Sequence, residues 1–162
     1  MRLVSRAGAL AYGLAAAVVA ADQTVKSWIV GGLGLTVGES HPLFGPLRLT
    51  LVENRGVSFG LFQGDAPWMR WALAAFSLAV ATALAVWVRR ASKLYTGLAL
   101  GLIIGGALGN FADRARFGQV VDFIDATALY FPWVFNLADS AITVGIVLLL
   151  IEGLFQSNAE RT

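Results

Sequence analysis

The sequence has no cysteine and a single histidine among its 162 residues. Without cysteine, the chain can form no disulfide bond and no thiolate metal site, and it has no thiol nucleophile. The one imidazole, His41, precedes Pro42 in a predicted turn, so neither a multi-histidine zinc site nor a Ser-His-Asp relay is expected. The chemistry open to this chain therefore depends mainly on carboxylates, lysine, tyrosine and hydroxyl groups.

Charge is also scarce, because 14% of the residues are charged and 57% are hydrophobic, with a mean hydropathy of +0.71. An ordinary soluble domain is about 25% charged, and a domain of this size cannot bury so much apolar surface. Part of its surroundings must therefore be lipid. The net charge of +2, in a sequence without a basic run, argues against nucleic acid as a partner.

Four apolar segments are long enough to cross a bilayer, which takes about 20 residues. They cover residues 7–29, 68–88, 94–111 and 137–155, with long connecting loops at 30–67 and 112–136. The sequence thus predicts an all-α membrane protein with four transmembrane helices, a single polytopic domain over residues 1–162. The first segment also has the composition of a cleavable signal peptide, but the three later spans favour its retention.

Basic residues predict the orientation of these spans. Arg2 and Arg6 precede the first span, and the tight loop RRASK (89–93) joins the second span to the third. Since lysine and arginine are densest in cytoplasmic loops, we expect both termini in the cytoplasm and both long loops outside.

The first long loop contains a strand pattern. In the stretch PLRLTLVEN (46–54), leucines alternate with Arg48 and Thr50, which is the period of a half-buried strand. The following stretch, ENRGVSFG (53–60), has glycines at two predicted turn or bulge positions. The sequence therefore predicts a small extracytoplasmic β-element in the first outer loop, resting on the membrane surface.

Each of three spans ends in polar residues on the predicted outer side. The third span has glycine at positions 97, 101, 105 and 109, a stripe that lets helices pack closely in lipid. The same helix face continues into Asn110, Asp113 and Arg114, and the fourth span begins with Asn136, Asp139 and Ser140. In the first span, Asp22 and Lys26 are placed to form an ion pair at i, i+4. Ionisable groups at membrane depth are costly and often mark a functional site.

Asp122 and Asp139 form the most informative pair, because each lies in an apolar context, VVDFI and NLADSA. Burial disfavours the charged form of a carboxyl group, and two nearby carboxyls can share one proton and activate a water, as in aspartic proteases. The spacing leaves other interpretations open. Asp139 could cap a helix, Asp122 could stabilise a turn, or the two could bind a cation together.

Five stretches carry a family resemblance: DQTVK (22–26), ENRGVSFG (53–60), GNFADR (109–114), GQVVDFID (118–125) and FNLADSAI (135–142). In order and spacing they resemble the five conserved blocks of lipoprotein signal peptidase, also called signal peptidase II. The resemblance implies an aspartyl endopeptidase of the bacterial inner membrane, with its active site near the outer face. Such an enzyme removes the signal peptide of a prolipoprotein just before a cysteine that carries diacylglycerol, and it uses no metal and no cofactor.

The resemblance also implies roles for individual residues. Asp122 and Asp139 correspond to the catalytic aspartates, and Asn54 and Arg114 would hold the substrate backbone or the cyclic-peptide inhibitor globomycin. Asp113 and Asn136 would orient their neighbours. The positions that match the family around the site are Asp22, Lys26, Asn54, Gly56, Asn110, Asp113, Arg114, Asn136 and Ala138.

Two other functions fit the composition. A small ion-coupled or proton-coupled carrier would also place carboxylates in the membrane, but of the membrane acids only Glu152 lies toward the predicted inner end. A structural scaffold would make those acids individually dispensable. Four spans surrounded by membrane lipid suffice for a monomer, which is the expected state.

Overall fold

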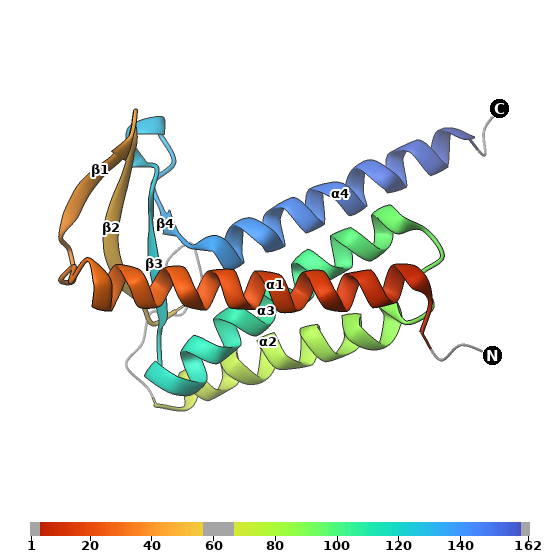
Figure 1. The fold of residues 1–162 in the computed structure, drawn as a ribbon, viewed down its shortest axis with the longest axis horizontal. Helices are drawn as coiled ribbons and strands as arrows, with labels where there is room; N and C mark the ends of the chain where they lie inside the picture. The colour runs from red at the N-terminus through yellow and green to blue at the C-terminus, as the bar shows by residue number, and fades with distance from the viewer. Residues whose placement is uncertain (1–3, 57–66, 160–162) are drawn as a thin grey trace.

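The computed structural model describes residues 4–56 and 67–159, which form a helical bundle with a small sheet at one end (Figure 1). The first and last described residues both lie at the opposite end of the bundle, apart from each other. Four helices in the described chain are long and apolar enough to cross a membrane. They are α1 (Arg6–Ser27), α2 (Pro67–Val88), α3 (Leu94–Phe117) and α4 (Leu137–Ala159).

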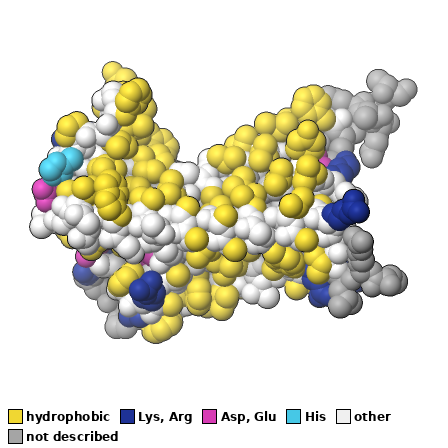
Figure 2. Space-filling view, in the orientation of Figure 1, with side chains coloured by type: hydrophobic (Ala, Val, Ile, Leu, Met, Phe, Trp, Pro, Cys, Tyr) yellow, Lys and Arg dark blue, Asp and Glu magenta, His cyan; other side chains and the backbone are white. Residues whose placement is uncertain are grey.

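The outer faces of the helices are apolar, as expected for a surface that contacts lipid. Figure 2 shows hydrophobic side chains along the bundle and dark-blue basic side chains mostly near its two ends. Large hydrophobic side chains are exposed along α2 and α4, among them Phe76, Val86 and Leu150. A short π-helical turn, Trp28–Gly32, extends α1 at the sheet end.

Helix α3 lies at the centre of the bundle and packs against the other three helices. Its glycine stripe faces α1, which confirms the predicted close packing. A Cβ atom added at Gly97 or Gly101 would lie 2.7 Å from a backbone carbonyl oxygen of α1, and one at Gly105 would lie 2.8 Å from another. A second contact, between Gly106 and the carbonyl of Ala138, brings α4 against another face of α3. The backbones of three helices therefore approach closely near the sheet.

The sheet is antiparallel with strand order β1-β2-β3-β4. Its strands are β1 (Ser40–Phe44), β2 (Leu47–Asn54), β3 (Val120–Asp125) and β4 (Val134–Phe135). The strand predicted in residues 46–54 is confirmed as β2, with Leu49 and Leu51 packed in a core with Phe123. The sheet is not confined to the first loop, because β3 and β4 come from the second. The residues of the ENRGVSFG stretch after Gly56 lie outside the described residues.

Helix α3 is longer than predicted, since residues 112–117 belong to the helix and not to the outer loop. Gly118, with φ of +82°, ends the helix in the left-handed conformation that glycine adopts without strain. Arg70 of α2 donates to the carbonyl oxygens of Arg114 and Ala115 at 3.0 and 2.9 Å. The carbonyl of Arg114 also accepts from the N–H of Gly118 at 3.1 Å, so Arg70 reinforces the last turn of the helix. Strand β3 begins two residues after Gly118.

The glycine stripe yields a first prediction. Replacing Gly101 by alanine should lower the free energy of unfolding by about 1–3 kcal/mol, because its Cβ would force α1 and α3 apart. Gly13→Ala is the matched control, since a Cβ at Gly13 meets nothing within 4 Å. Thermal unfolding in detergent micelles would measure both variants. Equal effects of the two substitutions would contradict the proposed packing role of Gly101.

Candidate active site

The start of α4 fixes the position of Asp139 through a reciprocal pair of hydrogen bonds. The side-chain oxygen of Asn136 accepts from the backbone N–H of Asp139 at 2.9 Å, and Oδ2 of Asp139 accepts from the N–H of Asn136 at 3.3 Å. This is the geometry of a capping box, with aspartate in place of glutamate. The other carboxylate oxygen of Asp139 accepts from Asn110 at 2.8 Å. Asp139 therefore caps its helix and still faces the side chains of α3.

Asp122 lies on strand β3 and not in the loop-end turn that the sequence left open. Its side chain is buried, with 1% exposed. Oδ2 accepts from the Asn54 side chain at 2.9 Å, and Oδ1 accepts from the Asn136 side chain at 2.7 Å. Asn54 is on the neighbouring strand β2, two residues beyond Val52, which pairs with Asp122. The sheet thus turns one carboxylate toward the start of α4.

Asn136 connects the two aspartates. Its side-chain amide nitrogen donates to Asp122, while its side-chain oxygen and its backbone N–H bind Asp139. Burial and the nearby charge of Asp139, partly offset by the two asparagine hydrogen bonds, raise the pKa of Asp122 to about 7. A carboxyl group with this pKa beside a second carboxyl group can share one proton with it near neutral pH.

A buried cluster of three charged side chains, Lys26, Asp22 and Asp113, lies next to this pair. Lys26, with 4% of its side chain exposed, is 2.8 Å from Asp22 and 2.7 Å from Asp113, and both carboxylates are also buried. The predicted ion pair between Asp22 and Lys26 is thus confirmed, and Asp113 of α3 joins it. Gln23 adds a hydrogen bond to Asp113 at 2.7 Å and one to Asp22 at 3.2 Å. The cluster ties α1 to α3.

The two acids of this cluster also hold the backbone on either side of the site. Oδ1 of Asp22 accepts from the N–H of Ala138 at 3.1 Å, and Oδ2 of Asp113 accepts from the N–H of Val121 at 3.1 Å. Ala138 and Val121 each directly precede one of the paired aspartates. The lysine cluster therefore positions the start of α4 and the middle of β3 at the same time.

Arg114 and Gly56 border the site on the side of strand β2. The guanidinium of Arg114 donates to the carbonyl of Gly56 at 3.2 Å, and the N–H of Gly56 donates to the side-chain oxygen of Asn54 at 3.0 Å. The backbone after β2 is thereby fastened to α3 and to the asparagine that binds Asp122. All the residues that the sequence motifs selected belong to this connected network.

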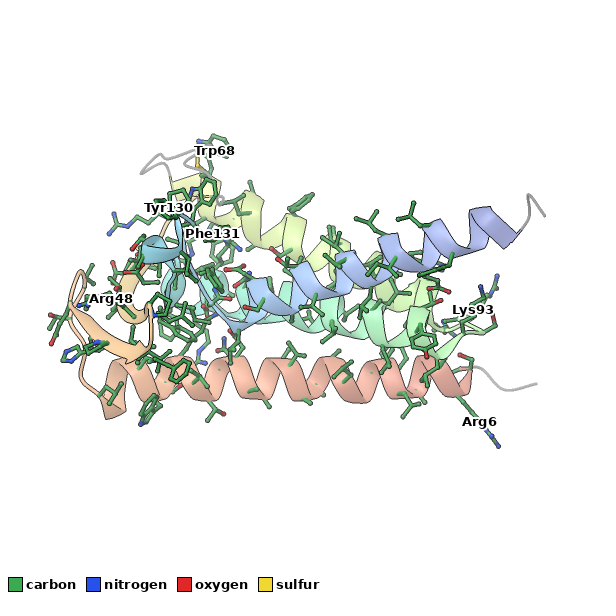
Figure 3. The ribbon with its side chains drawn as sticks, turned by 90° about the horizontal axis from the view of Figure 1, so that it is seen from above. Arg6, Arg48, Trp68, Lys93, Tyr130 and Phe131 are labelled. Atoms are coloured by element: carbon green, nitrogen blue, oxygen red, sulfur yellow. The ribbon has the colours of Figure 1, made fainter. Side chains whose placement is uncertain are left out.

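An apolar groove opens beside Asp139, between the turn before β4 and the first turns of α4. It has a volume of about 380 Å³, and its walls include Trp133, Thr143 and Val144. The ring of Phe131 packs edge-on against those of Trp133 and Phe135, with centroids 5.1 and 5.6 Å away. Figure 2 shows the surface hollowed between the sheet and α4, and Figure 3 shows Phe131 at the sheet end of the bundle. An extended, apolar ligand could reach Asp139 there.

The motifs did not select every residue that holds the site. Gln23 stood inside the DQTVK stretch, but its partner Asp113 is 90 residues away, and the spacing gave no sign of the contact. Arg70 was a single arginine at the start of a span, and only the fold brings it to the end of α3. Within residues 4–56 and 67–159, no group of three or more histidine, cysteine, aspartate or glutamate residues could hold a metal ion.

The ion cluster yields a second prediction. Lys26→Met should destabilise the protein by about 3–5 kcal/mol, because it leaves two buried carboxylates without their cation. Lys93→Met is the control, since Lys93 is 54% exposed and lies 3.6 Å from Glu152; an exposed pair contributes less than about 1 kcal/mol. Unfolding in detergent would compare the two, and a mild effect at Lys26 would refute the role of the cluster.

Comparisons with known proteins agree with this architecture. A family model described as signal peptidase (SPase) II matches residues 14–155. A lipoprotein signal peptidase from Caulobacter vibrioides is 53% identical over 150 residues, covering 92% of this chain and 89% of the relative. One from Brevibacillus brevis is 40% identical over 153 residues, covering 93% and 98%.

A solved structure described as a bacterial membrane enzyme superimposes with a TM-score of 0.83 and 29% identity, covering 100% of this chain and 96% of the other. A second bacterial membrane enzyme gives a TM-score of 0.78 and 30% identity, covering 95% and 97%. The likeness therefore extends over the helices and the sheet together. In sequence and in fold, the chain belongs to the signal peptidase II family of lipoprotein signal peptidases.

Proposed function

We propose that Asp122 and Asp139 are the catalytic pair of this membrane peptidase and that they activate a water to cut a peptide bond. The observation that carries the proposal is the bridge through Asn136, which binds both carboxyl groups at the edge of an apolar groove. The raised pKa of Asp122 adds support, because the pair can then hold a single proton near pH 7.

In the proposed reaction, the ionised aspartate takes a proton from the water as the water oxygen attacks the carbonyl carbon. The protonated aspartate gives its proton to the carbonyl oxygen, which forms a neutral tetrahedral intermediate. Collapse of this intermediate breaks the C–N bond: one aspartate gives its proton to the leaving nitrogen, and the other takes a proton from a hydroxyl of the intermediate. The products are a carboxylic acid and an amine, and the pair again holds one proton. Asn110, Asn54 and Asn136 hold the two carboxyl groups in place through hydrogen bonds from their side-chain amides.

The substrate we propose is a prolipoprotein whose cysteine carries diacylglycerol, with cleavage just before that cysteine. The groove beside Asp139 is walled by aromatic and aliphatic side chains, which suit a lipidated peptide that remains partly in the membrane. Asn54, Gly56 and Arg114 border the other side of Asp122 and could bind substrate backbone. Globomycin, a cyclic peptide, would compete for the same contacts.

We propose further that the sheet end of the bundle lies at the outer face of the bacterial inner membrane. Arg6, Arg89, Arg90 and Lys93 lie at the opposite end, where the first and last described residues also lie, and such basic density is typical of the cytoplasmic side. A monomer contains every side chain that the proposed reaction needs.

A carrier function finds little support in the described part of the chain. The acids that line the helices gather at the sheet end, and Glu152 is held by Thr96 and Lys93 at the other end. A proton or ion path would need acids at intermediate depth as well.

The catalytic proposal predicts that Asp122→Asn and Asp139→Asn each reduce cleavage at least about 10³-fold, since neither can then exchange a proton with water or substrate. Asp125→Asn is the matched control on the same strand. The side chain of Asp125 accepts hydrogen bonds from Thr50 and Thr127, away from the pair, so its variant should cleave at nearly the normal rate.

The measurement is cleavage of a diacylglyceryl-modified prolipoprotein by purified protein in detergent, with and without globomycin. Circular dichroism and size-exclusion chromatography would establish that each variant is folded. Normal processing by either asparagine variant would exclude the catalytic pair, even though the family assignment would stand.

The pH dependence follows from the raised pKa of Asp122. As pH rises through about 7, the pair loses its shared proton, so kcat/KM should fall on the alkaline side with an apparent pKa near 7 that belongs to the pair. At acid pH both carboxyls become protonated, and activity should fall again. Hydrogen bonds from Thr36 and His41 lower the pKa of Glu39 to about 2, so Glu39→Gln should leave the profile unchanged. A flat profile between about pH 6 and about pH 9 would contradict the shared proton.

A further inference from the structure

A second groove lies at the end of the bundle opposite the sheet, where α1, α2 and α3 meet. It has a volume of about 270 Å³. One wall is a face of α2 that includes Ala81 and Ala85 and continues to Arg89 just beyond the helix, and Tyr12 and Ile104 contribute from α1 and α3. No step of the proposed reaction uses this groove. The ligand inferred for it below does not depend on the proposed function.

The walls of the groove are apolar because their polar groups bind inside the protein. The Tyr12 hydroxyl donates to the carbonyl of Ala85 at 2.6 Å, and the Thr82 hydroxyl donates to the carbonyl of Leu78 at 2.8 Å. The remaining polar group in the lining is the guanidinium of Arg89, an exposed residue that directly follows the last residue of α2. The groove therefore presents hydrocarbon along its length and one cation at its mouth.

The surroundings of Arg89 are strongly basic. The N–H of Ser5 donates to the carbonyl of Arg89 at 2.9 Å, which brings the start of α1, with Arg6, to this corner. Figure 3 shows Arg6 and Lys93 at the same end of the bundle. Among the described residues, the acid at this end is Glu152, which already contacts Lys93 and Thr96. Among the described residues at this corner, cations therefore outnumber acids.

The groove also has the depth of one membrane leaflet. Ala81 of α2 and Arg89, just beyond its last residue, are eight positions apart, which corresponds to about 12 Å along a helix. Half of the hydrocarbon thickness of a bilayer is about 15 Å. An acyl chain that follows this face of α2 would therefore place its headgroup beside Arg89.

We propose that this groove binds an anionic phospholipid from the leaflet at this end of the bundle, with one acyl chain along α2 and the phosphate group against Arg89. Hydrocarbon walls select a lipid, and the excess of cations among the described residues at this end selects one with net negative charge. Such a lipid would fasten α2, whose span has one of the lowest buried shares of the four, to α1 and α3.

Native mass spectrometry of the full-length protein in neutral detergent would test the proposal with dioleoyl phosphatidylglycerol and dioleoyl phosphatidylcholine. The protein should retain one phosphatidylglycerol and bind it at least about fivefold more tightly than phosphatidylcholine, since one surface cation contributes about that factor. Arg89→Gln should remove most of this preference. Arg48→Gln, which removes the same charge on strand β2 at the far end of the molecule, should keep it.

A second pair of variants tests the groove itself. Thr82→Phe should fill it and weaken retention of both lipids, whereas Ala83→Phe, also exposed on α2 but outside the lining, should not. Equal binding of the two lipids, an unchanged preference in Arg89→Gln, or full competition by inorganic phosphate would overturn the proposal. A dimer that Thr82→Phe dissociates would assign the groove to a second copy of the chain instead.

Discussion

The rest of the structure depends on one buried cation, Lys26, held between Asp22 and Asp113. Burying three charges is costly, and a buried ion pair is by itself weak support for stability. The cluster matters here because its carboxylates hold backbone groups in place. One oxygen of each carboxylate also accepts from the backbone N–H directly before a paired aspartate, Ala138 for Asp22 and Val121 for Asp113. A single lysine on α1 therefore sets where α4 begins and where β3 lies.

This arrangement is possible only because the helices come unusually close. A Cβ at Gly109 would lie 2.9 Å from a carboxylate oxygen of Asp22, and one at Gly106 would collide with the carbonyl of Ala138. Side chains larger than hydrogen at these positions would move α1 and α4 away from α3. The hydrogen bond between Asp22 and Ala138 would then break. The glycines thus serve the site as well as the packing of the bundle.

The sequence was informative where a pattern is local. Hydropathy located the four spans, leucine alternation located β2, and the i, i+4 spacing of Asp22 and Lys26 indicated their ion pair. Strand β3 was missed because VVDFID does not alternate apolar and polar residues, since most of its side chains are buried. The roles of Gln23 and Arg70 could not be predicted, because each depends on a partner more than 40 residues away.

The burial that raises the pKa of Asp122 also adds a free-energy cost to ionising the paired aspartates. Desolvation and the charge of Asp139 raise the pKa of Asp122, so ionising that group in the folded state costs free energy as pH rises toward 7. Asn54 and Asn136 offset part of that cost by donating to the carboxylate. Asn136 also caps α4. The side chain that stabilises the charge on Asp122 is therefore held in place by the helix that carries Asp139. Stability of the helix start and protonation of the pair are therefore coupled through one side chain.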